Sequence, residues 1–431
     1  MKKKLLAVLL TAAMTVSLCA CGAQATTEAP AADAAAEVTA EEPAAETTEA
    51  AGGTITLWVA DAITDFTKEQ CDAFFAANPN YAGYDVVIEA VGEGDAAGNI
   101  ITDVEGGADI FGFAQDQLTR LVAANALTEL TGDYAAIVDN DNNAGAAEGS
   151  KVGGKSYAFP LTADNGYFLY YDKSVVSDPS TLEGIVADCE AAGKNMYFEI
   201  NSAWYQTAFF FGTGCELTYE TDDAGAFTTC NCDYASDKGL VALKAMAKLN
   251  ESPAFVNGSS ISNGSDIGAI VDGTWDSQAA KDMFGDNYAC AKLPTFEGAD
   301  GKTYQLSGFN GFKLLGVKPQ TDAAKLEACL ELAKFLSSEE VQLARYELTG
   351  WGPSNLAAAA NEKVQADEAL CALAEQFVYT IPQGQYPGDY WSLGTALGDD
   401  IIAGNITSTT DDDTLMAVLT QFQETCASYA N

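Results

Sequence analysis

Strand and helix patterns alternate through the first part of the chain, and this alternation restricts the fold more than any other feature of the sequence. Residues 54–59 alternate apolar and polar side chains, as a strand does. Residues 66–77 then place apolar side chains on one helical face, with Thr64 or Asp65 as the expected cap. Further strands are predicted at 85–91 and 108–113, and further helices at 99–104 and 118–124. The order predicts an α/β fold with a parallel sheet and right-handed crossovers.

The second half of the chain continues with strands and then becomes almost wholly helical. Strands are predicted at 166–171, 195–200, 267–271, 288–293 and 311–317, with a helix at 238–249 and a hairpin turn at 221–226. From Asp322 onward apolar residues recur at helical spacing, and three more helical patterns follow Asn361. Residues 54–431 exceed one ordinary domain, so two domains are expected.

The N-terminal residues read as an export signal. Three lysines at positions 2–4 precede an uncharged apolar stretch at 5–18, which is too short to cross a bilayer as a mature helix. Cys21 follows the small residue Ala20, so residues 1–20 are predicted to be a lipoprotein signal peptide and Cys21 the lipidated residue. The alternatives are plain secretory cleavage, or lipidation at Cys19, which would put the bulky Leu18 before the cut.

Residues 21–53 are predicted to be the lipidated cysteine followed by a disordered spacer. The spacer consists almost entirely of Ala, Thr, Glu and Pro, and Val38 is its only large apolar residue. Such a segment tethers a folded domain at a distance from the surface. We therefore expect the protein on the extracellular face of the bacterial cytoplasmic membrane, touching lipid only through its N-terminal anchor.

The charge and the missing histidines exclude several functions. The formal net charge is −41, and without the three signal lysines 18 basic residues face 62 acidic ones, which makes −44. Such a field repels nucleic acid and anionic ligands, so a neutral or cationic small molecule is favoured. A chain without histidine has no His-based zinc site or Ser-His-Asp triad. With no Gly-rich phosphate loop either, no metal, nucleotide or other cofactor is expected.

Nine cysteines remain after Cys19 and Cys21 are set aside, and an odd number leaves at least one thiol free. Most of them sit in apolar patterns and read as small buried side chains. Cys215 and either Cys230 or Cys232 flank the predicted hairpin turn, so a disulfide there, with Cys230 as the first candidate, is consistent with export.

Three tryptophans stand at element ends or in loops beside polar residues: Trp204, Trp275 and Trp391. A flat indole face stacks against the CH-rich face of a sugar ring, while neighbouring Asp, Asn or Gln side chains hydrogen-bond to its hydroxyls. Trp58, inside a strand, and Trp351, after the late helices, read as structural. The pattern suggests a carbohydrate site.

Four segments, in this order, carry a resemblance to a known family. They are residues 108–116 with the following helix and 125–130, residues 157–161 with 170–173, residues 270–275, and residues 381–383 with 390–391. Across 54–431 the chain resembles the extracellular solute-binding proteins of sugar importers, and most closely the maltose/maltodextrin-binding proteins. The resemblance implies that the protein binds a ligand and is not an enzyme.

The resemblance also implies the ligand-binding residues, by position. They are Asp61, Phe113, Gln115, Asp116, Asp164, Asn165, Trp204, Trp275, Asp276, Tyr390 and Trp391. Phe113 stands where the maltodextrin binders usually have tryptophan, Asp164 or Asn165 where they have glutamate, and Gln117 where they often have arginine. Malto-oligosaccharide preference does not follow from the resemblance, because subsite identity depends on these side chains.

The implied fold is a two-lobed, periplasmic-binding-protein-like type II α/β fold with the ligand cleft between the lobes. The N-terminal lobe would hold 54–162 plus 308–358, and the C-terminal lobe 163–307 plus 359–431. The protein would be a monomer that closes on an oligosaccharide and delivers it to the membrane permease subunits of an ABC importer, powered by a separate cytoplasmic ATPase. Rival readings are a secreted glycoside hydrolase, a surface adhesion lipoprotein, and a binder of a non-sugar ligand such as a polyamine.

Overall fold

The computed structural model describes residues 52–430. The predicted signal peptide, Cys21 and nearly all of the predicted spacer lie outside these residues. Within them, no helix combines the length and apolar character that a membrane span requires.

The first sheet contains six strands from distant parts of the chain. They are β1 (Gly52–Val59), β2 (Gly83–Ala90), β3 (Ile110–Ala114), β6 (Ala158–Asn165), β16 (Phe309–Val317) and β17 (Ile381–Pro382). The order is β17-β16-β3-β1-β2, with β6 also paired to β16. β1 pairs in parallel with β2 and β3, whereas β16 runs antiparallel to β3 and β6. Ile55, Leu57 and Val59 on β1 are buried because alternate side chains point into the core.

The second sheet has five strands in the order β11-β8-β12-β7-β13. They are β7 (Phe168–Asp172), β8 (Asn195–Tyr197), β11 (Phe255–Val256), β12 (Ile267–Asp272) and β13 (Tyr288–Ala291). Three two-stranded sheets complete the strands: β4 (Lys151–Val152) with β5 (Lys155–Ser156), β9 (Leu217–Thr221) with β10 (Phe227–Cys232), and β14 (Thr295–Glu297) with β15 (Thr303–Gln305). The hairpin predicted around residues 221–226 is thus confirmed.

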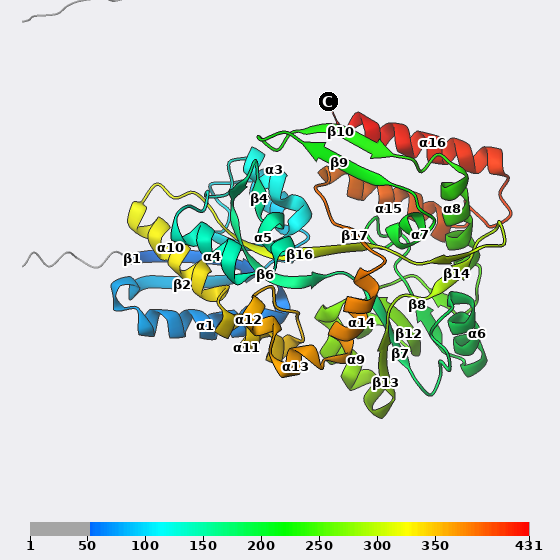
Figure 1. The fold of residues 1–431 in the computed structure, drawn as a ribbon, viewed down its shortest axis with the longest axis horizontal. Coiled ribbons are helices and arrows are strands. Elements are labelled where there is room, and N and C mark those ends of the chain that lie inside the picture. Colours follow the sequence, from blue (N-terminus) through cyan, green and yellow to red (C-terminus); the bar gives the residue numbers. More distant parts are fainter. Residues whose placement is uncertain (1–51, 431) are drawn as a thin grey trace, which may run out of the picture. The chain divides into compact units, whose positions relative to one another are not determined.

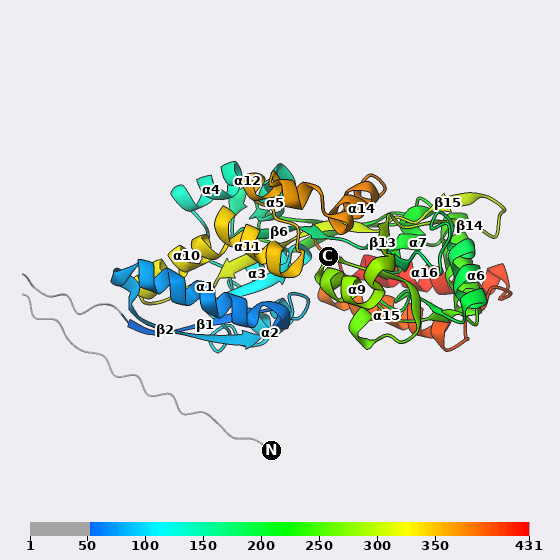
Figure 2. The same cartoon turned by 90° about the horizontal axis from the view of Figure 1, so that it is seen from below.

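Helices cover both sheets (Figure 1). They are α1 (Thr64–Ala77), α2 (Ala96–Thr102), α3 (Leu118–Ala123), α4 (Asp133–Asp141), α5 (Ala144–Gly149), α6 (Leu182–Ala192), α7 (Thr207–Gly212), α8 (Asp237–Asn250), α9 (Ser277–Phe284), α10 (Ala323–Leu336), α11 (Glu339–Thr349), α12 (Leu356–Ala359), α13 (Glu362–Gln365), α14 (Glu368–Phe377), α15 (Gly388–Ile402) and α16 (Asp412–Ser428). Figure 2 shows α1 and α10 with the first sheet, and α6 and α9 with the second. Each sheet and its helices form an α/β lobe with its own apolar core.

The predicted elements are present with shifts at their ends, but several observed elements, among them β6, α6 and α9, were not predicted. The helix predicted at 99–104 begins three residues earlier, at Ala96. α1 begins at Thr64, but no side chain caps it, because the Thr64 hydroxyl donates to the carbonyl of Asp61 instead. Four helices, rather than three, follow Asn361 among the described residues.

Candidate ligand-binding cleft

The candidate site lies where four strands of the first sheet end or begin. The pairing of β16 with β3 sets Lys313 opposite Ala114, and its pairing with β6 sets Gly311 opposite Asn165. β17 joins the same strand through Asn310 and Pro382. Segments far apart in the sequence therefore present their side chains to one place.

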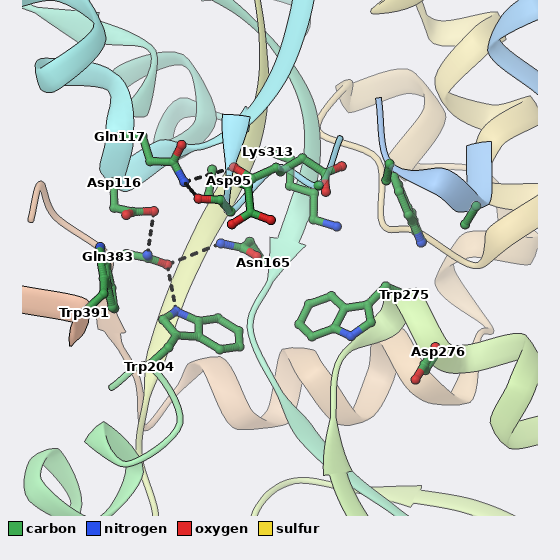
Figure 3. Close-up of a pocket in the computed structure, with 17 residues that line it drawn as sticks. Asp95, Asp116, Gln117, Asn165, Trp204, Trp275, Asp276, Lys313, Gln383 and Trp391 are labelled. Carbon is green, nitrogen blue, oxygen red and sulfur yellow. Dashed lines mark hydrogen bonds between the residues drawn. The ribbon is translucent and has the colours of Figure 1, made fainter. Parts of the chain in front are cut away.

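The cavity at this place has a volume of about 600 Å³, within the range of small-molecule sites. Four tryptophan, four acidic, three amide and one lysine side chains reach it, together with small residues of the adjoining loops. The lining consists of Ala60, Ala62, Gly92, Glu93, Gly94, Asp95, Ala114, Asp116, Gln117, Asn165, Trp204, Trp275, Asp276, Lys313, Trp351, Gln383 and Trp391 (Figure 3). Flat apolar faces alternate with hydrogen-bonding groups, which is the surface that a polyhydroxylated ring requires.

One part of the cavity is organised by Gln383. Its Nε2 donates to Asp116 Oδ1 at 2.9 Å, while its Oε1 accepts from Trp204 Nε1 at 3.2 Å and from Asn165 Nδ2 at 3.3 Å. Figure 3 shows these three contacts converging on the one amide. We call Asp116, Asn165, Trp204 and Gln383 the Gln383 network. Each member comes from a different segment, so the network fixes the Trp204 ring relative to the first sheet.

The carboxyl of Asp116 is the buried titratable group of this network, with 3% of its surface exposed. Burial raises the pKa of Asp116 to about 7, and the positive charge of Arg120 opposes the rise. Near neutral pH the side chain can therefore act as a donor or as an acceptor toward a hydroxyl group.

In the other part of the cavity, the ammonium group of a lysine lies against the rings of two tryptophans. The Nζ of Lys313 lies 4.1 Å from the ring centroid of Trp351 and 5.2 Å from that of Trp275. Trp275 in turn lies 5.9 Å from Trp204, centroid to centroid, at an interplanar angle of 45°. We call Lys313, Trp275 and Trp351 the Lys313 cluster. Cation–π attraction holds the ammonium group over the rings.

The turn that carries Trp275 is held by buried aspartates. Asp164 Oδ2 accepts from Thr274 Oγ1 at 2.5 Å and from the Gly352 amide at 2.6 Å, and Asp272 accepts from the Gly273 amide at 2.7 Å. A Cβ on Gly273 would lie 2.1 Å from the Trp275 ring, so only glycine permits this fold of the turn. Burial raises the pKa of Asp272 well above its usual range, with a further rise from the nearby charge of Asp276.

Comparison with known proteins identifies the family. The family model described as bacterial extracellular solute-binding protein matches residues 61–372. The chain belongs to this family. The resemblance inferred from the sequence is thereby confirmed.

Relatives and solved structures cover most of this solute-binding protein. The maltooligosaccharide ABC transporter solute-binding lipoprotein of Streptococcus pneumoniae R6 is 26% identical over 76% of this chain and 78% of its own length. The galactooligosaccharide-binding protein of Bacillus subtilis 168 is 25% identical over 90% and 89%. A solved complex with acarbose is 30% identical with a TM-score of 0.75, and a maltodextrin-binding protein of L. casei BL23 without ligand is 25% identical with a TM-score of 0.72. Each covers 88% of this chain and 99% of its own. The two-lobed type II fold expected from the sequence is confirmed.

The cleft of this solute-binding protein contains six of the residues predicted for it. Asp116, Asn165, Trp204, Trp275, Asp276 and Trp391 line the cavity. The structure brings them together from η3 (Gln115–Gln117), β6, the loop before α7, η5 (Thr274–Asp276) and the start of α15. Whether each of them contacts ligand stays a prediction.

Five predicted residues lie outside the lining. Phe113 is fully buried against Phe111, because β3 turns alternate side chains away from the cavity. Asp164 is buried and engaged with Thr274 and Gly352, so it positions the Trp275 turn. Asp61 is exposed beside two lining alanines.

The remaining two, Tyr390 and Gln115, also direct their side chains away from the cavity. Tyr390 is buried, donates to the Ala203 carbonyl at 3.2 Å and packs edge-on against Trp391 at 4.9 Å. Gln115 packs against Gly149, where a Cβ would come within 2.8 Å of its Nε2. In both residues, the backbone lies in a segment that borders the cavity, but the side chain points away from it.

Sequence reasoning missed several lining residues. Lys313 lies in the middle of an apolar strand, and only its charge in a run of buried residues could have marked it. Gln383 belongs to the 381–383 segment that carried the resemblance, but it was not predicted as a site residue, and its central place in the hydrogen-bond network could not be read from the sequence. Trp351, read as structural, is buried and also lines the cavity.

The cysteines of this solute-binding protein are free thiols throughout the described residues. The Sγ of Cys215 lies 3.7 Å from the Thr213 hydroxyl, whereas Cys230 and Cys232 lie on β10 opposite Tyr219 and Leu217 of β9. The structure pairs Cys215 with neither of its two candidate partners. No cluster of acidic or cysteine side chains in residues 52–430 could hold a metal ion.

Proposed function

We propose that this protein captures an oligosaccharide in the cleft and delivers it to an ABC importer. The observation that carries the proposal is the meeting of Trp204, Trp275 and Trp391 with the Gln383 network in one cavity. Indole faces stack on pyranose rings, and buried amide and carboxyl groups read their hydroxyls. The names of the relatives, which bind maltooligosaccharide and galactooligosaccharide, point to the same ligand class.

Within this proposal, the ligand contacts divide into stacking and hydrogen-bonding groups. Trp204, Trp275 and Trp391 would stack on successive rings, and Asp116, Asn165 and Asp276 would bind hydroxyls. Asp61 lies at the rim, so it would reach the ligand only after closure. Phe113, Gln115, Asp164 and Tyr390 would act by holding these groups in place.

Capture would proceed by closure of the two lobes about their connections. We take the lobes as residues 54–162 plus 308–358 and residues 163–307 plus 359–431, a division by which the end of β6 and all of β17 extend from the second lobe into the first sheet. β6 belongs to the first sheet and β7 to the second, and Gly166 and Tyr167 alone separate them, which favours a short hinge there. A ligand that contacts both lobes stabilises the closed state, which permease subunits would recognise. A separate cytoplasmic ATPase would supply the energy.

The anchor is the second part of the proposal: Cys21 would carry lipid and hold the protein on the extracellular face of the membrane. Cys21→Ala should move the protein from the membrane fraction to the medium, because the acidic spacer has no affinity for lipid. Fractionation of cells that express the variant measures this. A variant that stays in the membrane fraction would show that another element is the anchor.

The proposed ligand class is tested by incubating the purified protein with labelled oligosaccharides and following both binding and product. Binding without turnover is the expected result. Turnover would instead identify a glycoside hydrolase, which needs two carboxyl groups flanking one glycosidic bond, and the acidic residues at the cavity make this a fair test. Binding of a polyamine but no sugar would reassign the ligand.

A further inference from the structure

A second cavity adjoins the main cavity at Trp391. It has a volume of about 390 Å³ and shares Gly94, Asp95 and Trp391 with the main cavity. Its own residues include Asn99 on α2, Arg120 on α3 and Gly388 at the start of α15. We call it the annex. Because the two cavities share three lining residues, a ligand that occupies the main cavity can extend into the annex past the Trp391 ring.

Arg120 is the side chain that determines which ligand groups the annex can bind. Its Nε is buried and has no hydrogen-bond partner among residues 52–430. One of its terminal nitrogens, Nη1, lies so close to Gly388 that a Cβ there would be 2.8 Å away. The guanidinium is thus packed against the backbone of a glycine and has N–H donors without partners. A ligand in the annex cannot reach the buried Nε, so a sugar acceptor would take its hydrogen bond from the terminal nitrogens of the guanidinium.

The surroundings of Arg120 favour a neutral acceptor over an anion. Asp116 and Asp389 lie near enough to interact electrostatically with the guanidinium, and Asp95 lines the same cavity. These carboxylates offset the positive charge and would repel a phosphate or carboxylate ligand. A guanidinium offers donors only, and a sugar hydroxyl or ring oxygen accepts from it without bringing charge. Asn99, which is exposed, can add both a donor and an acceptor.

We propose that the annex is a subsite for an additional sugar unit of an oligosaccharide held in the main cavity, with Arg120 and Asn99 as its polar contacts. This inference rests on the proposed function, since it extends the same ligand. Trp391 then separates two successive subsites, and the annex makes the protein select longer chains over shorter ones.

The test measures affinity against ligand length by calorimetry, with malto-oligosaccharides and galacto-oligosaccharides from disaccharide to heptasaccharide. The wild-type affinity should rise at the length that first reaches the annex. Arg120→Ala should remove that rise, with a loss of roughly tenfold for the long ligands and under about twofold for the shortest that binds, as expected for a hydrogen bond from a charged donor.

Gly388→Ala is the matched variant. It keeps the arginine but displaces its terminal nitrogen, so it should reproduce the length-dependent loss with a change of a single methyl group. Thermal unfolding of both variants shows whether they fold, and the wild-type length series stands even if one of them does not.

Three results would overturn the proposal that the annex binds a sugar unit. They are a wild-type affinity that does not change beyond the shortest bound ligand, an equal loss at every length in Arg120→Ala, and no loss at any length. All three outcomes still leave the wild-type protein binding sugar, so the proposed function would stand. A wild-type protein that binds no member of either series would overturn the proposed function and the annex together.

Discussion

The two parts of the cleft are held by different forces. The Gln383 network joins its four members through directed hydrogen bonds of 2.9 to 3.3 Å. The Lys313 cluster has cation–π and packing contacts instead, with the Lys313 ammonium over Trp351 and Trp275. A ligand hydroxyl must compete with existing partners in the first part, whereas in the second it meets ring faces and an ammonium with donors to share.

This difference predicts how substitutions in each part should lower the stability of the protein. Removing a member of the Gln383 network leaves buried donors or acceptors without partners. Removing a ring from the Lys313 cluster leaves a void instead, with a cost that grows with its volume. The predictions that follow separate these two costs from each other and from the cost to ligand binding.

The largest effect is expected for Trp351→Ala, which removes the most buried ring of the Lys313 cluster. Trp351 is 3% exposed and packs with Val59 and Ile63. Truncation should lower the free energy of unfolding by about 3 to 5 kcal/mol, the usual cost of a large core cavity. Urea denaturation measures it. A loss under about 1 kcal/mol would mean that Trp351 serves the ligand rather than the fold.

A pH-dependent effect is expected from the Gln383 network. Burial raises the pKa of Asp116 to about 7, whereas the unfolded carboxyl titrates near about 4. The native state therefore binds this proton more tightly, so the contribution of Asp116 to stability is full below about pH 4 and is lost as the pH rises to about 7. Asp116→Asn should remove that decline, which amounts to at most about 4 kcal/mol.

Urea denaturation at successive pH values measures the slope. Asp95→Asn, a change at an exposed carboxyl of the same cavity, serves as the control. If Asp116→Asn keeps the wild-type slope, the hydrogen bond from Gln383 and the charge of Arg120 hold the carboxylate ionised, and the account of this network given above is wrong.

A smaller effect, mainly on binding, is expected for two half-buried tryptophans, Trp275 of the Lys313 cluster and Trp391, which the main cavity shares with the annex. Trp275→Ala and Trp391→Ala should each weaken oligosaccharide binding by about 1 to 3 kcal/mol, because each loses a stacking face. Affinity and denaturation midpoint are measured on the same samples, with Trp351→Ala as the structural comparison. Normal affinity with lost stability in both variants would place the ligand elsewhere.

The smallest effect is expected from salt. Stacking and hydroxyl hydrogen bonds release no counterions, so raising the salt to molar concentration should change oligosaccharide affinity by less than about twofold. A titration at low and at high salt measures it. A tenfold loss would show that the Lys313 ammonium or the acidic side chains bind a charged ligand instead.

Much of the fold was readable from the sequence because it depends on local patterns. The alternation at 54–59 predicts β1, and the apolar stripe with Leu326, Cys329 and Leu330 predicts α10. The three loop tryptophans marked the cleft, and Asp116 and Asn165 were found through the resemblance. Such signals lie within a few residues of one another, and hydrophobic periodicity suffices to read them.

The tertiary structure alone decided which side chain reaches the cavity and what it does there. A one-residue step along β3 separates buried Phe113 from Ala114 at the cleft, and pairing across β16 brings Lys313 to the same place. The hub role of Gln383 depends on contacts to residues 179 to 267 positions away. The sequence by itself thus determined the class of fold and the kind of ligand surface. The direction of each side chain depends on strand register and long-range pairing, which no local pattern encodes.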